Sequence, residues 1–140
     1  MKNYFEIDHT PQNKDIEFLI EKLTSFNKKH LTDIARVPIA LWYKNEKGEI
    51  IGGISGNTFG KWLRIKYMWV EESVQFSGVG SHLLLKIEEE AANRNCQFSF
   101  VDTYDFQARP FYLKNGYVEI FSLQEYPISG KRHFFTKNIC

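Results

Sequence analysis

The sequence predicts a single mixed α/β domain over residues 1–140, with a mostly antiparallel sheet flanked by helices in the order β-α-β-β-β-α-β-α-β-β. Two adjacent β-rich segments, separated by the turn signal Asn45-Glu46-Lys47-Gly48, indicate an antiparallel hairpin. Further along, a strong amphipathic helix lies between two β-like segments, which is typical of a βαβ crossover. Because no internal repeat and no linker rich in Pro, Gly or Ser divides the chain, we expect one domain.

The first third of the chain is expected to supply a strand and a helix. Residues 4–8 alternate apolar and polar side chains, as a short strand does. The pair Thr10-Pro11 is a helix start signal, and the helix that follows should end near residues 29–31. Apolar residues recur at helical spacing in this helix: Ile16, Leu19, Ile20, Leu23 and Phe26.

A hairpin and a third strand should follow. Residues 36–44 and 49–59 form the hairpin, and residues 61–72 are the longest β-like run in the chain. Glycines in the second strand indicate a β-bulge or a close approach of another group to the backbone. They are Gly52, Gly53 and Gly56.

The strongest helix of the chain begins after Gly78. Its apolar residues form one stripe, and we expect Glu88, Glu89 and Arg94 to face water. The stripe consists of Val79, Leu83, Leu84, Ile87 and Ala91.

The C-terminal part completes the sheet. Residues 98–103 predict a short strand buried on both faces, and residues 106–114 predict a short helix that stops at Asn115-Gly116. Residues 117–124 and 133–139 predict a final antiparallel pair.

Composition excludes several classes of protein. There are 18 basic and 17 acidic residues, so the net charge of +1 gives no footprint for nucleic acid. The two cysteines, Cys96 and Cys140, fit neither a disulfide framework nor a structural zinc site, and we expect no metal. No apolar run is long enough to span a membrane, and no signal-peptide core is present. We therefore expect a cytoplasmic protein without membrane or nucleic-acid partners.

The junction between the third strand and the strong helix is suited to binding phosphate. The backbone N–H groups in the first turn of a helix lack intrahelical partners, and the helix dipole favours negative charge there. Gly78 and Gly80 carry no Cβ that would hold a diphosphate away from those groups, and Gln75 can donate a further hydrogen bond. Two glycines alone are equally consistent with a tight turn. The segment is neither a dinucleotide fingerprint nor a P-loop, because it lacks the third glycine and the Gly-Lys-Ser/Thr ending.

The junction Gln75-x-x-Gly78-x-Gly80 resembles the acetyl-CoA motif of the GNAT superfamily of N-acetyltransferases, Arg/Gln-x-x-Gly-x-Gly/Ala. That family places a strand, a short helix and an aromatic segment about thirty residues later. Here the segment is Phe111-Tyr112-Leu113-Lys114-Asn115-Gly116-Tyr117, with Ala108 four residues before the tyrosine. The resemblance extends from residue 49 to residue 117, and the predicted order of elements extends it over nearly the whole chain.

The resemblance implies that acetyl-CoA is a co-substrate and that Tyr112 is the general acid protonating the departing sulfur. The pantetheine arm should pair with the backbone at the end of the third strand, and the pyrophosphate should lie on the following turn. A core aromatic is the competing interpretation of Tyr112. The implied cofactor-binding residues are Met68, Trp69, Val70, Gln75, Phe76, Ser77, Gly78, Val79, Gly80, Ser81 and Asp105.

Two departures from the family pattern concern the cofactor. Gln75 replaces the commoner arginine, which removes a charge-assisted contact to phosphate. Asp105 stands where many members have an asparagine that contacts the cofactor arm, and capping a helix that begins at Phe106 is the favoured interpretation.

The general base is the third departure. Many members carry a glutamate on the long strand, where this sequence has Arg64 and Lys66. Glu72, acting through water, is the base that we expect from the end of that strand. The sequence does not choose between it and the other titratable candidates, Glu71, His82, Asp102 and Asp105.

The resemblance implies direct attack of a primary amine on the thioester, in a small molecule or a protein, because neither cysteine fits an acyl-enzyme. Residues 26–36 and 123–133 should set acceptor identity. Three tryptophans are candidates for an aromatic wall, with packing as the commoner role: Trp42, Trp62 and Trp69. The alternative function is a non-catalytic acyl-CoA sensor or interaction module. Phe134-Phe135 could pair with a second subunit in a homodimer, although burial in the monomer explains it equally well.

Overall fold

The computed structural model describes residues 2–32, 34–75, 77–106 and 108–140, in two compact units, Met1–Ile34 and Ala35–Cys140. The single domain expected from the sequence stays a prediction. No helix in the described part of the chain is both long and apolar enough to cross a membrane.

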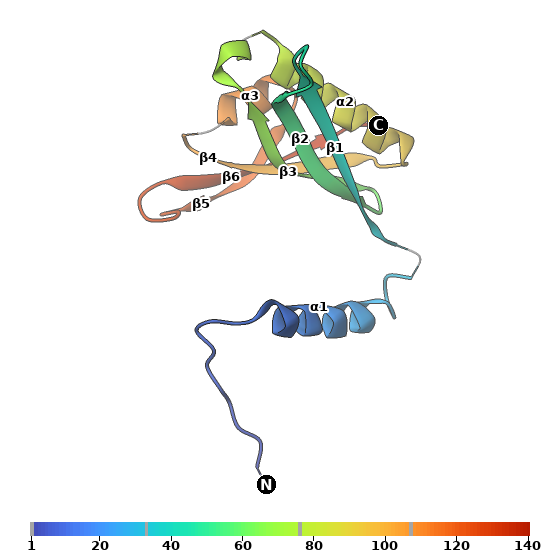
Figure 1. Ribbon diagram of the computed structural model, residues 1–140, viewed down its shortest axis with the longest axis vertical. Coiled ribbons are helices and arrows are strands. Elements are labelled where there is room, and N and C mark those ends of the chain that lie inside the picture. Colours follow the sequence, from blue (N-terminus) through green and yellow to red (C-terminus); the bar gives the residue numbers. More distant parts are fainter. Residues whose placement is uncertain (1, 33, 76, 107) are drawn as a thin grey trace. The chain divides into compact units, whose positions relative to one another are not determined.

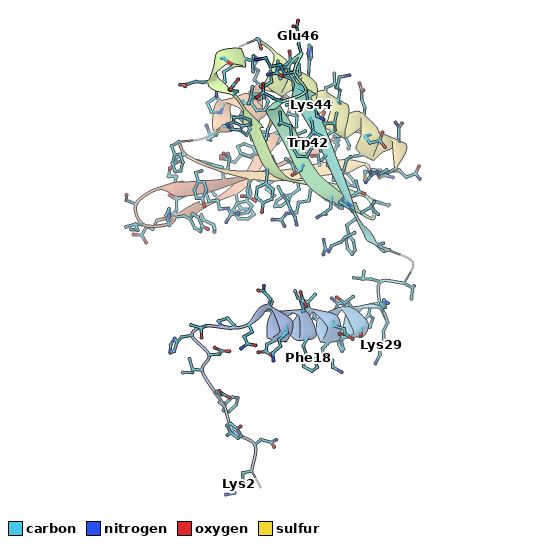
Figure 2. The ribbon with its side chains drawn as sticks, viewed as in Figure 1. Lys2, Phe18, Lys29, Trp42, Lys44 and Glu46 are labelled. Carbon is cyan, nitrogen blue, oxygen red and sulfur yellow. The ribbon has the colours of Figure 1, made fainter. Side chains whose placement is uncertain are left out.

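The described residues of the N-terminal unit form one helix, α1 (Asn13–Asn27), which carries Phe18 (Figure 2). The carbonyl of Gln12 accepts hydrogen bonds from the backbone N–H groups of Asp15 and Ile16, and these bonds start the helix. The strand expected over residues 4–8 is wrong, since these residues form no regular structure. A helix satisfies its hydrogen bonds within itself, whereas a strand needs a neighbour, and a five-residue alternation does not supply one.

The second unit is built on a six-stranded sheet (Figure 1), which confirms the predicted mixed, mostly antiparallel fold. The strand order is β1-β2-β3-β4-β6-β5, and every neighbouring pair is antiparallel except β3 with β4. The strands are β1 (Arg36–Lys44), β2 (Ile50–Phe59), β3 (Trp62–Val70), β4 (Phe98–Tyr104), β5 (Val118–Gln124) and β6 (Lys131–Asn138).

Helices α2 (Val79–Asn93) and α3 (Arg109–Lys114) complete this unit, together with the short 3-10 turn η1 (Glu72–Val74). Helix α2 packs across β1, β2 and β3, and α3 contacts β5 (Figure 1). The predicted apolar stripe of α2 is confirmed, because four of its residues are buried in the core: Leu83, Leu84, Ile87 and Ala91.

The prediction that Glu88 of α2 faces water is wrong. Its residue is only 5% exposed, and its carboxylate accepts hydrogen bonds from Lys137 Nζ and from the Tyr117 hydroxyl, each at 2.8 Å. The hydroxyls of Tyr117 and Ser99 are 2.7 Å apart. A charged residue is tolerated inside because these partners replace water.

A β-bulge interrupts the pairing of β2 with β3, as the glycines of β2 indicated. Ser55 pairs with Tyr67 and Gly56 with Ile65, so Lys66 is the extra residue on β3. A Cβ at Gly56 would overlap the carbonyl oxygen of Arg64 and lie 2.9 Å from its carbonyl carbon. Only glycine therefore permits the two backbones to approach this closely.

Strand β6 is internal to the sheet, since β4 pairs with one of its edges and β5 with the other. Phe135 is fully buried in the core, and the ring of Phe134 stacks on that of Phe121 with centroids 4.4 Å apart. Both edges of β6 are already paired, so Phe134-Phe135 does not pair edge to edge with a second subunit; Phe135 is buried in the core, and Phe134 is half-buried against Phe121. A homodimer through another surface stays a prediction.

Candidate active site

The sheet opens between β3 and β4. These parallel strands pair only over residues 62–64 and 98–100. Apart from the bulge residue Lys66, the backbone of residues 65–70 is paired with β2 and not with β4. A cleft of about 650 Å³ occupies the gap, and its lining includes Met68, Trp69 and Val70. An unpaired strand edge along a cleft can hydrogen-bond an extended ligand.

Tyr112 projects from α3 onto this cleft. Its residue is 4% exposed, and its hydroxyl donates to the sulfur of Met68 at 3.9 Å. Burial, reinforced by the negative charge of Asp102, raises the pKa of Tyr112 to about 12. The side chain is therefore a neutral phenol at ordinary pH, and a neutral phenol can give a proton to a developing thiolate.

The segment before α3 is held by polar contacts. The backbone N–H of Ala108 donates to Thr103 Oγ1 at 3.2 Å, and Arg109 binds both carboxylate oxygens of Glu119 at 3.2 and 3.3 Å. The hydrogen bond from Arg109 lowers the pKa of Glu119. Glu119 also contacts His133 Nδ1, and Asp105 contacts His133 Nε2. Nothing in the sequence signalled the placement of Glu119 and His133.

Asp105 differs from its expected capping role. Helix α3 begins at Arg109 after Ala108, not at Phe106, so Asp105 is too far from it to be the N-cap. Its carboxylate instead contacts His133, which joins the end of β4 to β6. The sequence placed the start of the helix too early, and a side chain four residues before the first helical residue cannot cap it.

The phosphate-binding junction begins at the end of β3. Gln75 Nε2 donates to the carbonyl of Val70 at 3.0 Å, and the Ser77 hydroxyl donates to the carbonyl of Val74. Gly78 is the N-cap of α2 with φ of +87°, a left-handed conformation that favours glycine. Phe76 lies outside the described residues.

The two motif glycines have different surroundings. A Cβ at Gly78 would meet nothing within 4 Å, so it would protrude into open space at the start of the helix. A Cβ at Gly80 would lie 3.3 Å from Met68 Cε and 3.3 Å from Phe111 Cε1. Gly80 thus allows α2 to approach β3 and α3, while the amide groups of the first turn have no partner within the helix.

The candidate general bases differ in whether they line the cleft. Asp102 is part of the cleft lining, whereas Glu71, Glu72, His82 and Asp105 are not. Glu72 begins the exposed turn η1.

The tryptophans and Cys96 likewise differ in their position relative to the cleft. Trp42 and Trp69 line the cleft, whereas Trp62 lies against Phe98 with centroids 4.9 Å apart. Cys96 is buried beside the Gly60 carbonyl, where β3 and β4 are still paired, which confirms that it lies away from the cleft.

No group of three metal-ligating residues occurs among the described residues.

The open parallel pair, the glycine-lined start of α2 and the buried Tyr112 define the class of acyl-CoA-dependent N-acyltransferases. The profile of the acetyltransferase (GNAT) family matches residues 4–117, and the chain belongs to that family.

Known proteins agree with this assignment. The chain is 35% identical over 95 residues to a blasticidin-S acetyltransferase of Streptomyces morookaense, covering 67% of this chain and 70% of the relative. The crystal structure of an acetyltransferase from Bacillus cereus superimposes with a TM-score of 0.85 at 34% identity, over 95% of this chain and 97% of that one. An aminoglycoside 6'-N-acetyltransferase complexed with coenzyme A shares the fold, with a TM-score of 0.67 at 15% identity over 94% and 96% of the two chains.

Proposed function

We propose that this protein transfers the acetyl group of acetyl-CoA directly to a primary amine of a small molecule. The observation that carries the proposal is the position of Tyr112, a neutral buried phenol on a cleft that is bordered by the open edge of β3. The small-molecule acceptor is favoured because the relative from Streptomyces morookaense is named for acetylating blasticidin S.

The cofactor in this proposal lies along β3 and ends on α2. Its pantetheine arm pairs with the backbone of residues 68–70, and its pyrophosphate accepts hydrogen bonds from amide groups within residues 75–81. The open space at Gly78 supports this placement. Gln75 and Asp105 belong to the proposed binding set; the side chain of Gln75 donates to the Val70 carbonyl, and that of Asp105 contacts His133.

The reaction proceeds by attack of the neutral amine on the thioester carbonyl. The carbonyl oxygen gains negative charge, the C–S bond then breaks, and Tyr112 gives its proton to the leaving sulfur. The bulge at Lys66 leaves part of β3 outside the ladder, so a backbone N–H there would be available to polarise the thioester carbonyl.

The test is release of free thiol from acetyl-CoA across a panel of amines. Tyr112→Phe should lower kcat by about 100-fold or more, because general acid catalysis contributes at least that much. Its affinity for CoA, measured by calorimetry, should not change. Tyr43→Phe, on β1 and outside the cleft, is the matched control and should keep full activity. Full activity in Tyr112→Phe would remove the general-acid role.

The alternative is an acyl-CoA sensor without turnover. The exposed position of Glu72, outside the cleft, favours it, because the base expected from the sequence then has no contact with the reaction. Tight binding of CoA combined with no thiol release for any amine would support the sensor and contradict the enzyme.

A further inference from the structure

The cleft passes through the sheet, because its lining comes from both faces. Met68 and Val70 pack against the buried core, so Tyr67 and Trp69, which alternate with Val70 and Met68 on β3, point to the opposite face. On β4 the buried residues Val101 and Thr103 flank Asp102, which therefore also points away from the core.

Asp102 is held in place by one of its two oxygens. Arg132 Nε donates to Oδ1 at 2.8 Å, and Arg132 Nη2 lies 2.6 Å from the same oxygen. The other oxygen, Oδ2, is 4.0 Å from Arg64 Nη2, beyond hydrogen-bond distance. Arg132 is itself fixed, because its Nη1 donates to the Tyr126 hydroxyl at 2.9 Å. The carboxylate is thus oriented in the cleft with acceptor capacity on Oδ2.

Aromatic rings face Asp102 across the gap. Trp42 on β1 is paired through Gly53 with Trp69 on β3, and residues opposite each other in antiparallel strands share a face. A Cβ at Gly53 would lie 2.7 Å from Trp42 Cε3, so the indole ring lies close over the backbone of β2 at Gly53. Figure 2 shows Trp42 on β1, with Lys44 and Glu46 beyond it towards the turn. Trp42, Tyr67 and Trp69 form what we call the aromatic wall of the cleft.

The charges around Asp102 limit how many positive charges the acceptor can carry. Arg64 and Arg132 flank its carboxylate, and Lys66 lines the same cleft. Two arginines beside one carboxylate and a lysine on the same cleft leave an excess of positive charge there, so a second or third positive charge on the acceptor would be repelled. One amine carried on a flat apolar body fits both the carboxylate and the aromatic wall.

We propose that the acceptor is a monoamine carrying a flat apolar group, that its body packs on the aromatic wall, and that Asp102 receives its amine. The proposal rests on the acetyl transfer proposed above, and it replaces Glu72 with Asp102 as the carboxylate that meets the acceptor.

The proton transfers balance in this arrangement. The nitrogen lone pair forms the C–N bond, and the positively charged nitrogen of the tetrahedral intermediate then loses a proton to Asp102 Oδ2. The C–S bond breaks, and the sulfur takes the phenolic proton of Tyr112. Water returns the proton from Asp102 to solvent and restores the phenol.

The experiment compares 2-phenylethylamine with spermidine and methylamine as acceptors. For the wild type, kcat/KM should be higher for 2-phenylethylamine than for spermidine by about tenfold or more. Asp102→Asn should raise the KM for 2-phenylethylamine and lower kcat, with a combined loss of about 100-fold, at unchanged KM for acetyl-CoA. Asp102→Glu should restore part of the loss. The matched control Glu46→Gln, in the β1–β2 turn, should behave as the wild type.

A separate variant tests the aromatic wall. Trp69→Leu should raise the KM for 2-phenylethylamine but not that for methylamine, which has no body to pack on the ring. A structural defect would affect both amines, and thermal denaturation of each variant identifies loss of folding directly.

The outcomes are distinguishable from failure of the proposed function. If the wild type turns over no amine, binding of 2-phenylethylamine to the CoA-loaded protein, measured by calorimetry, still tests the role of Asp102. The inference requires that Asp102→Asn weakens this binding. Preference for spermidine, or an Asp102→Asn protein with wild-type constants, overturns this inference while leaving acetyl transfer intact. Loss of activity in Glu72→Gln with full activity in Asp102→Asn assigns the role to Glu72 instead.

Discussion

The hydroxyl of Tyr112 lies 3.9 Å from the sulfur of Met68, and this contact joins the short helix α3 to the open edge of β3. The tyrosine hydroxyl thus contacts a side chain of the strand along which the cofactor is proposed to lie. A thioether is a weak hydrogen-bond acceptor, so the hydroxyl loses little when it turns to a cofactor sulfur.

The pH profile of the reaction follows from the pKa of Tyr112. Because burial raises this pKa from 10.0 to about 12, the phenol stays protonated through the range in which acceptor amines lose their protons. We expect kcat to show no falling limb between pH 7 and pH 10. Thiol release measured across that range checks this. A falling limb in the wild type that is absent in Tyr112→Phe would contradict it.

Tyr117→Phe should affect stability and leave catalysis unchanged. Its hydroxyl bonds the buried carboxylate of Glu88 and contacts Ser99, so its removal should cost about 1–3 kcal/mol of unfolding free energy. Burial, followed by the charge of Glu88, raises the pKa of Tyr117, so its stabilising effect is complete below pH 10 and declines as pH rises further. Urea denaturation of both proteins at pH 7 and above pH 10 measures the difference. A loss of kcat with wild-type stability would refute this assignment.

Gly56→Ala should disrupt the bulge. The added Cβ overlaps the Arg64 carbonyl, a backbone group that cannot move without breaking pairing, so we expect a loss of about 1–3 kcal/mol and reduced activity. Gly52→Ala is the matched control on the same strand, because its Cβ meets its nearest atoms at an ordinary 3.5 Å. Thermal denaturation and thiol release distinguish the two variants. Equal stability of both would show that the bulge does not require glycine.

Gly78→Ala should weaken cofactor binding more than it weakens the fold. The left-handed φ of +87° costs alanine about 1–2 kcal/mol, while the methyl group enters the space proposed for the pyrophosphate. We expect the Kd for CoA, measured by calorimetry, to rise about tenfold or more. An unchanged Kd in a folded protein would place the pyrophosphate elsewhere.

Local patterns in the sequence predicted the sheet, the helix after Gly78 and the position of Tyr112 on a short helix. Those features depend on neighbouring residues, namely the period of the apolar stripe, the glycine turn and the alternation along β3. The bulge was likewise indicated by the glycines of β2.

Features that depend on residues distant in sequence were missed. Glu88 is charged at a helical position that normally faces water, and only its pairing with Lys137 and Tyr117 explains its burial. The contact between Asp105 and His133 joins residues 28 positions apart, and no local sequence pattern predicts it. Asp102 was one candidate base among several until the separation of β3 from β4 showed which carboxylate borders the cleft.

The short pairing of β3 with β4 also has a mechanical consequence. Three residue pairs, between residues 62–64 and 98–100, are the only ladder joining β1–β2–β3 to β4–β6–β5 in the described structure. Beyond residue 64 the two halves are joined by side-chain packing in the common core and not by backbone hydrogen bonds, so a small change in the width of the gap breaks no strand pairing. A ligand bound along β3 and against α3 would contact both halves of the sheet and restrict their movement relative to each other. Amide exchange at residues 65–70 should therefore slow when CoA binds, although the strand itself does not change its pairing with β2.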